Sequence, residues 1–333
     1  MKEHRRLKTA AIILTAYFLF LLVINMIPPK KNVEANPFLV EAGGRPLIAA
    51  HRGGGINYPE NTMLAFREAV RTAGADILEG DLHLTKDGHL VFSHKNYIDE
   101  TCNVNGDIPL ETVKRLCEDT KNRHYIFNMT LAELQQYNFG YYFEDREGVR
   151  IYKNAEDSAA MGLQIATLDQ LFSEFYGDYP ELMFLLEIKG SENRGINGAK
   201  ALWMDLEQYP EYIDRTVVGT FHDEVEDYLR THCPRLLRGA STESAVVFTA
   251  TQLLRLNYFD KSDFACLPIP YLPLGLTGAS LIRRAHSRNI AVQFWTVNDE
   301  KQMRKLIKLG CDCIITDDPL LLKQVMNEYG LLS

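Results

Sequence analysis

The chain has 333 residues, a formal net charge of -8 and 46% hydrophobic residues. This length accommodates one large α/β domain or two ordinary ones, each with a sizeable core. The negative charge argues against a nucleic-acid partner, because nucleic-acid binding usually requires a basic stripe. Six cysteines are too few for a disulfide scaffold. Cys311-x-Cys313 lacks a second Cys or His pair, so we interpret both cysteines as buried small hydrophobes rather than zinc ligands.

The first predicted element is an uncharged apolar segment, residues 9–27, which is long enough to cross a bilayer as a helix. The basic excess is greater on its amino side, which favours a cytoplasmic stretch at 1–8 and a domain on the non-cytoplasmic side. A cleaved signal peptide is the alternative, although the apolar segment is longer than the usual signal-peptide core. We therefore predict a single-pass membrane protein with a linker at 28–45 and one domain over 46–333.

From Pro46 onward, apolar segments typical of buried strands alternate with amphipathic helical segments. Eight strands with helical crossovers predict an α/β fold, the TIM (β/α)8 barrel. An extra short strand at Leu90–Phe92 follows Lys86-Asp87-Gly88, a sequence that favours a hairpin turn. The eight barrel strands are predicted at Leu47–Ala50, Ile77–Leu82, Leu182–Ile188, Thr216–Thr220, Leu236–Gly239, Phe264–Leu267, Ile290–Val297 and Asp312–Thr316.

A long polar segment at about 99–166 departs from the strand and helix alternation. It contains helical patches near Leu110–Cys117 and Leu131–Tyr137. Long loops in compact domains are usually functional or disordered. We therefore interpret this segment as an insertion beside the predicted site.

The strand at Ile77–Leu82 carries charge where a buried parallel strand is expected to be apolar on both faces. Glu79 and Asp81 lie two residues apart, so both point to the same side. Carboxylates this close repel unless a proton or cation lies between them, and oxygen ligands suit Mg²⁺ or Ca²⁺. A salt bridge to Lys or Arg is the alternative. Glu187 also ends a strand, and a barrel gathers its strand ends at one rim, so Glu187 can complete a three-carboxylate cation site.

Other polar residues follow predicted strands and suggest phosphate chemistry. His51 and His94 are candidates for a general acid and base, although a lone His is more often structural. Arg52 either pairs with a phosphate or forms a salt bridge at the rim. Lys189 is either a donor to a phosphate or part of a charge network with the carboxylates. Trp295 forms either an apolar wall for a substrate or part of the core.

Six separated segments carry sequence motifs, namely HRGGGINYPENT (51–62), LEGDLHLTKDG (78–88), SH (93–94), LEIK (186–189), WTVN (295–298) and GCDCIITDDP (310–319). Together these segments resemble the glycerophosphodiester phosphodiesterase family. The resemblance implies a TIM barrel with a small insertion, a divalent cation on the three carboxylates, the two histidines as an acid/base pair, and Arg52 on the phosphate. One departure is Lys95, where the family usually has Asp after the second His.

The resemblance implies metal-dependent hydrolysis of a glycerophosphodiester to sn-glycerol 3-phosphate and an alcohol. A lysophospholipase D-like activity on lysophospholipids is an alternative that the predicted anchor favours. A sphingomyelinase D-like activity would use the same barrel and two histidines, but the intact TDDP segment at 316–319 disfavours it. From another class, the chain could be a catalytically silent, membrane-anchored binding module. The joint presence of the histidines and carboxylates argues against that alternative.

Overall fold

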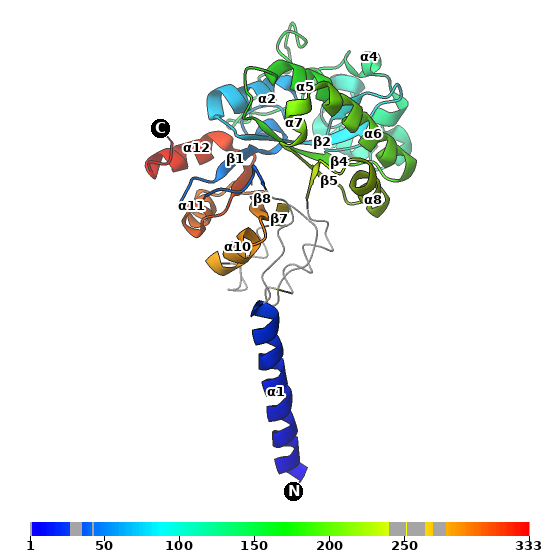
Figure 1. The fold of residues 1–333 in the computed structure, drawn as a ribbon. Helices are drawn as coiled ribbons and strands as arrows, with labels where there is room; N and C mark the ends of the chain where they lie inside the picture. Colours follow the sequence, from blue (N-terminus) through cyan, green and yellow to red (C-terminus); the bar gives the residue numbers. More distant parts are fainter. Residues whose placement is uncertain are drawn as a thin grey trace.

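The computed structural model describes residues 2–26, 35–41, 43–239, 251, 264–268 and 278–332. Helix α1 (Lys2–Met26) extends away from the remaining structure (Figure 1). Its segment Arg5–Met26 is long and apolar enough to cross a membrane, and none of its most apolar window is buried. A signal sequence passes the same test. Residues 27–34 of the predicted anchor and linker lie outside the described residues.

The remaining chain folds as the predicted TIM barrel, with eight parallel strands in the order β6-β5-β4-β2-β1-β9-β8-β7. Among the described residues, β6 and β7 are the two ends of this order. All eight predicted barrel strands are confirmed. The predicted and observed bounds differ by no more than two residues at either end of any strand. The strands are β1 (Leu47–Ala50), β2 (Ile77–Leu84), β4 (Met183–Ile188), β5 (Thr216–Gly219), β6 (Leu237–Arg238), β7 (Phe264–Pro268), β8 (Ala291–Trp295) and β9 (Cys313–Thr316).

The predicted hairpin is also confirmed, because the short strand β3 (Leu90–Phe92) pairs antiparallel with the end of β2. Helices between the strands begin at local sequence signals, such as the capping box of Thr167 and Gln170 at the start of α5. The helices that accompany the barrel are α2 (Met63–Glu68), α5 (Leu168–Phe175), α6 (Glu192–Gln208), α7 (Pro210–Ile213), α8 (Asp223–His232), α10 (Ala279–His286), α11 (Glu300–Leu309) and α12 (Pro319–Glu328).

Strand side chains divide into two apolar layers because neighbouring residues of a strand point to opposite faces. Ile48 and Ala50 of β1 pack in the layer between sheet and helices, whereas Ala49 packs in the barrel interior. Ile77 of β2 belongs to the same interior layer. Both Cys311 and Cys313 are buried, in accord with their interpretation as small hydrophobes.

A short segment before β1 fills the amino-terminal end of the barrel. Phe38 is fully buried in the interior layer, where it packs with residues such as Ile77. The backbone N–H of Val40 donates to Asp312 Oδ1 at 2.9 Å, and Asn36 Nδ2 donates to the Asn289 carbonyl at 2.8 Å. Asp312 lies one residue before β9 and Asn289 two residues before β8, so this segment lies opposite the end where the strands deliver their polar residues.

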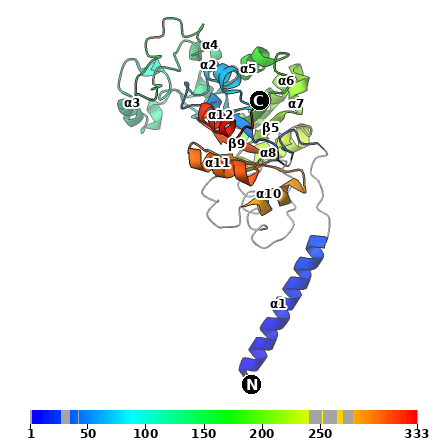
Figure 2. The ribbon, with the colours of Figure 1, turned by 90° about the vertical axis from the view of Figure 1, so that its left-hand side faces the viewer.

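Segment 99–166 follows β3 at the carboxyl end of the barrel. Its longer helices are α3 (Leu110–Leu116) and α4 (Leu131–Leu134), which match the two predicted helical patches. Two apolar clusters around Ile98 and Val113 hold it together. In both ribbon views α4 lies at the end of the molecule far from α1 (Figures 1 and 2).

Candidate active site

The three carboxylates of the predicted site lie at the carboxyl ends of two neighbouring strands. Glu79 and Asp81 continue the inward side of β2 that begins with Ile77, and they are only 8% and 2% exposed. Strands β2 and β4 pair in parallel with Asp81 directly opposite Glu187. The barrel register therefore brings together side chains that are more than 100 residues apart in sequence.

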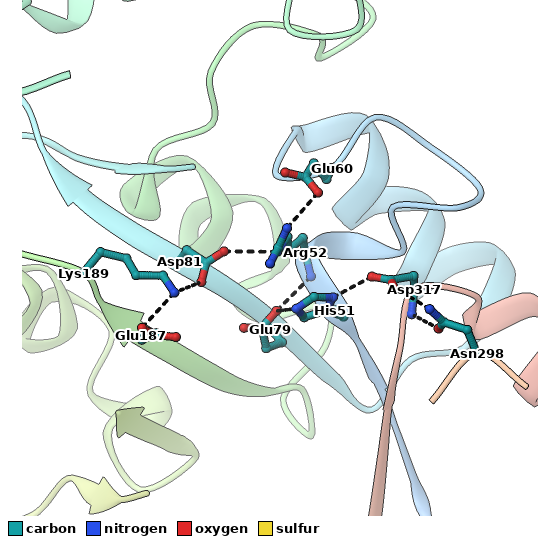
Figure 3. Close-up of polar contacts among 9 residues, drawn as sticks. All are labelled: His51, Arg52, Glu60, Glu79, Asp81, Glu187, Lys189, Asn298 and Asp317. Atoms are coloured by element: carbon teal, nitrogen blue, oxygen red, sulfur yellow. Dashed lines mark hydrogen bonds and ion pairs between the residues drawn. The ribbon is translucent and has the colours of Figure 1, made fainter. Parts of the chain in front are cut away.

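Two basic side chains lie among these carboxylates (Figure 3). Lys189 Nζ is 3.0 Å from Asp81 Oδ1 and 2.8 Å from Glu187 Oε1. Arg52 Nε is 3.2 Å from Asp81 Oδ2, and Arg52 Nη1 donates to Glu60 Oε2 at 3.1 Å. The ion pairs that the sequence left open as an alternative to a cation are therefore formed. Within the described ranges, no group of three His, Cys, Asp or Glu side chains is arranged to hold a metal ion.

The carboxylates nevertheless outnumber the bases around them. Burial raises the pKa of Glu79 to about 7, with His51 acting against the shift and the charge of Asp81 adding to it. Burial also raises the pKa of Glu187, although Lys189 opposes the shift. Apart from the ion pairs with Arg52 Nε and Lys189 Nζ, the buried oxygens Asp81 Oδ2 and Glu187 Oε1 have no hydrogen-bond partner among the residues described. Two permanent cations and His51 face five carboxylates, namely Glu60, Glu79, Asp81, Glu187 and Asp317.

His51 is held between two carboxylates at the end of β1. Its Nδ1 lies 2.5 Å from Oδ1 of Asp317, and its Nε2 lies 3.9 Å from Oε2 of Glu79. Burial alone would lower the pKa of His51, but the hydrogen bond to Asp317 and the charge of Glu79 raise it on balance. Asn298 Nδ2 donates to Asp317 Oδ2 at 2.7 Å, and the Asp317 N–H donates to Asn298 Oδ1 at 2.9 Å. The imidazole ring is therefore fixed in orientation by a chain of polar contacts.

The glycine turn after β1 aims Arg52 into the site. Arg52, Gly53 and Gly54 all have left-handed backbone angles, with φ of 52°, 82° and 94°. A Cβ atom on Gly54 would lie 2.9 Å from the Pro319 ring, so only glycine fits there. The turn also lets the Arg52 N–H donate to Glu79 Oε2 at 2.9 Å.

His94 and Trp295 lie at the open edge of the site. His94 lies just after β3 with its ring partly exposed, and its partial burial together with the charges of Arg52 and Lys189 lowers its pKa. It lines one cavity together with Glu60, the partner of Arg52, so it lies beside the same polar cluster. Trp295 ends β8 and is 38% exposed, so it belongs to the rim and not to the core.

Sequence reasoning assigned no role to Glu60, Asn298 or Asp317. Each contacts a predicted site residue or supports one that does. All three lie in the segments PENT, WTVN and TDDP, which were noted as motifs without individual assignments. The signal that could have found Asp317 is its place directly after a buried strand, at the same rim as His51.

Comparison with known protein families identifies a match over most of the barrel. Residues 51–321 match the sequence model of the Glycerophosphoryl diester phosphodiesterase family. The chain belongs to this family. The matched range contains every residue of the predicted site, from His51 to Trp295.

Individual relatives cover most of the chain. A glycerophosphodiester phosphodiesterase of Caldanaerobacter subterraneus is 28% identical over 285 residues, which are 85% of this chain and 99% of that protein. A lysophospholipase D of Rattus norvegicus is 25% identical over 84% of this chain and 86% of its own length. A phosphodiesterase structure from Oleispira antarctica, in complex with the product sn-glycerol-3-phosphate, superposes with a TM-score of 0.60 at 19% identity. It covers 85% of this chain and 97% of that one, and it shows the shared fold. The chain is thus a family enzyme with glycerophosphodiester phosphodiesterase activity.

Proposed function

We propose that this enzyme hydrolyses glycerophosphodiesters to sn-glycerol 3-phosphate and an alcohol, with a divalent cation bound by Glu79, Asp81 and Glu187. The observation that carries the proposal is the convergence of these carboxylates with Arg52 and His51 at one barrel mouth (Figure 3). A phosphodiester is an anion whose cleavage adds charge to its oxygens, so it requires both cationic groups and proton transfer.

The chemistry of these three carboxylates suits a divalent cation, although among the described residues they are paired with Arg52 and Lys189 and are not arranged as a metal-binding group. The buried oxygens Asp81 Oδ2 and Glu187 Oε1 have only the ion pairs with Arg52 and Lys189, and burial raises the pKa of Glu79 to about 7. A further positive charge would therefore favour the ionised form of the cluster. All three donors are hard oxygen ligands, as Mg²⁺ and Ca²⁺ prefer. When bound, such an ion would offset the negative charge on the phosphoryl oxygens.

Arg52 and Lys189 are proposed to bind the phosphate. Both are held by Asp81, since Arg52 Nε lies 3.2 Å and Lys189 Nζ 3.0 Å from its carboxylate. A guanidinium can donate two parallel hydrogen bonds to a phosphate, and an ammonium adds a point charge. Their fixed positions would orient the diester before reaction without further loss of side-chain entropy. Trp295, at the rim, is proposed to contact the apolar face of the glycerol.

His51 and His94 are proposed to move the protons. One imidazole takes the proton of the glycerol 2-hydroxyl as this oxygen attacks phosphorus, and the other gives a proton to the departing alkoxide. Water then opens the resulting 2,3-cyclic phosphate at phosphorus, which leaves sn-glycerol 3-phosphate. Asp317 is a positioning residue in this scheme, because its bond to Nδ1 leaves Nε2 of His51 directed toward the site.

Lysophospholipids are a second candidate substrate class, with a lysophospholipase D-like reaction. The rat relative carries that name, and the apolar helix α1 would place the enzyme at a lipid surface. We propose that α1 anchors the chain as a single-pass membrane protein with its barrel on the non-cytoplasmic side. Protease added to intact cells should degrade the barrel under this topology, whereas protection of the barrel would contradict it.

The activity is tested with the full chain in detergent. Glycerophosphocholine should be hydrolysed with Mg²⁺ or Ca²⁺ present, and a chelator should abolish turnover reversibly. Glu187→Gln should lower kcat by at least about 100-fold, because a ligand charge is lost without a change of shape. Glu181→Gln is a matched control just before β4, where the carboxylate is 86% exposed, and it should behave like the wild type. Full activity of Glu187→Gln, or unchanged turnover after chelation, would refute the proposed cation site.

A further inference from the structure

A cavity of about 240 Å³ opens beside His94, between the barrel mouth and segment 99–166. We call it the insertion pocket. Residues of the loop after β1 line one part of it, and Leu110, Phe139, Tyr142 and Phe143 line another. Its lining residues are Gly55, Pro59, Glu60, His94, Lys95, Glu100, Thr101, Leu110, Phe139, Tyr142 and Phe143.

The wall far from the barrel is apolar and well packed. Phe139 and Tyr142 are each 8% exposed, so their rings are held by neighbouring side chains. Tyr142 donates its hydroxyl proton to the Ile108 carbonyl at 3.0 Å, which leaves its ring as the part available to the pocket. The Arg150 guanidinium already lies 4.7 Å from the centre of the same ring. This wall therefore offers apolar surface but not an open aromatic cage for a cationic headgroup.

The carboxylates that line the pocket are already paired. Glu60 accepts from Arg52 at 3.1 Å, and Glu100 lies 2.6 Å from the Lys95 ammonium. The Lys95 ammonium therefore neutralises the Glu100 carboxylate. The pocket consequently has no unpaired carboxylate to attract a quaternary ammonium or any other cationic group.

We propose that the insertion pocket binds an alkyl chain, or a similar uncharged apolar group, of the phosphodiester substrate. The inference rests on the proposed function, because it assumes that the phosphate lies between Arg52 and Lys189. His94 belongs both to the pocket and to the proposed acid/base pair, so a substituent in the pocket is adjacent to the scissile phosphate. The cavity volume of about 240 Å³ is many times the space that a single water molecule needs, which is enough for a short chain.

The chain can belong to either side of the diester, and the test separates the two sources. One substrate is a lysophosphatidylcholine with a six-carbon acyl group on the glycerol, used below its micelle concentration. The other is glycerophosphohexanol, in which the six-carbon chain is the leaving alcohol. Glycerophosphocholine, which has neither chain, is the reference. We expect kcat/KM at least about 10-fold higher than the reference for one of the two chain-bearing substrates, because apolar contacts discriminate by about that factor.

Variants then link this preference to the pocket. Leu110→Asn replaces an apolar wall with an amide at the half-buried first residue of α3 and should reduce the preference about 10-fold. Phe143→Asn repeats the test from a second part of the wall. Leu116→Asn is the matched control, because Leu116 lies on the same helix, is 45% exposed and does not line the pocket. It should keep the wild-type preference.

The outcomes distinguish this inference from the proposed function. If glycerophosphocholine is hydrolysed and neither chain-bearing substrate is preferred, the apolar pocket is refuted and the phosphodiesterase function stands. The same holds if Leu110→Asn and Phe143→Asn both retain the full preference. If no diester is hydrolysed with either metal ion, the proposed function itself is wrong.

Discussion

The contact between His51 and Asp317 predicts a measurable loss of turnover in Asp317→Asn. The two side chains are 2.5 Å apart, and the Asp317 side chain is only 27% exposed. Asn has the same shape but only one acceptor oxygen. Asp317 accepts from both His51 and Asn298, so the amide can satisfy just one of these donors. The variant therefore loses a hydrogen bond and the negative charge beside the imidazole.

The size of the effect follows from the kind of bond that is lost. Hydrogen bonds to charged groups contribute about 1.5–3 kcal/mol. One factor of ten in rate corresponds to about 1.4 kcal/mol, so kcat should fall about 10- to 100-fold. KM should change little, because the orientation of the imidazole matters most when a proton moves in the transition state.

The assay is steady-state hydrolysis of glycerophosphocholine, with the melting temperature measured in parallel. Asp299→Asn is the control, since Asp299 caps α11 through its side chain and Asn is an equally good cap. That variant should match the wild type in both kcat and stability. A kcat for Asp317→Asn within about twofold of the wild type, with the fold intact, would show that His51 does not depend on this carboxylate for its role.

Three further changes test the scaffold and the cation site. Phe38→Ala should lower the free energy of unfolding by about 3–5 kcal/mol in urea titrations, because it removes a fully buried ring from the amino-terminal end of the barrel. A loss below about 1 kcal/mol would contradict that packing. Gly80→Ala should cost about 1–3 kcal/mol, since the new Cβ would lie 2.6 Å from the Phe92 ring, whereas Gly219→Ala meets no atom within 4 Å and should be tolerated. Mg²⁺ or Ca²⁺ at 100 times its dissociation constant should stabilise the wild type by about 2.7 kcal/mol, and an equal gain in Glu187→Gln would argue against that ligand.

Local patterns were sufficient to predict the strands and most of the side chains that gather at the barrel mouth. The apolar strand β1 is followed directly by His51 and Arg52, and the apolar strands β2 and β4 contain the carboxylates of the candidate site. Charged residues in or directly after an apolar segment can be recognised without any knowledge of the fold. Because side chains alternate between the two faces of a strand, Glu79 and Asp81 were predicted to lie on one face of β2. The predicted barrel then placed Glu187 at the same rim. These inferences depend only on strand geometry, which has a period of two residues everywhere.

Contacts between distant segments could not be derived in this way. That Lys189 lies between Asp81 and Glu187, and that Asp317 holds His51, depends on side-chain directions at the rim and on the register of β1 with β9. Phe38 lies in a segment predicted to be a linker, and its burial follows from an open barrel end that no local pattern describes.

The sequence by itself determined the barrel, the order of its strands along the chain and the chemical groups at their ends, because periodicity and strand polarity are local properties. Only the tertiary structure decided which of those groups pair, that the carboxylates outnumber the bases, and that segment 99–166 and the loop after β1 together line a pocket beside His94. Pairing and enclosure depend on distances between residues that are far apart in the chain, and those distances are set by the packing of the whole barrel.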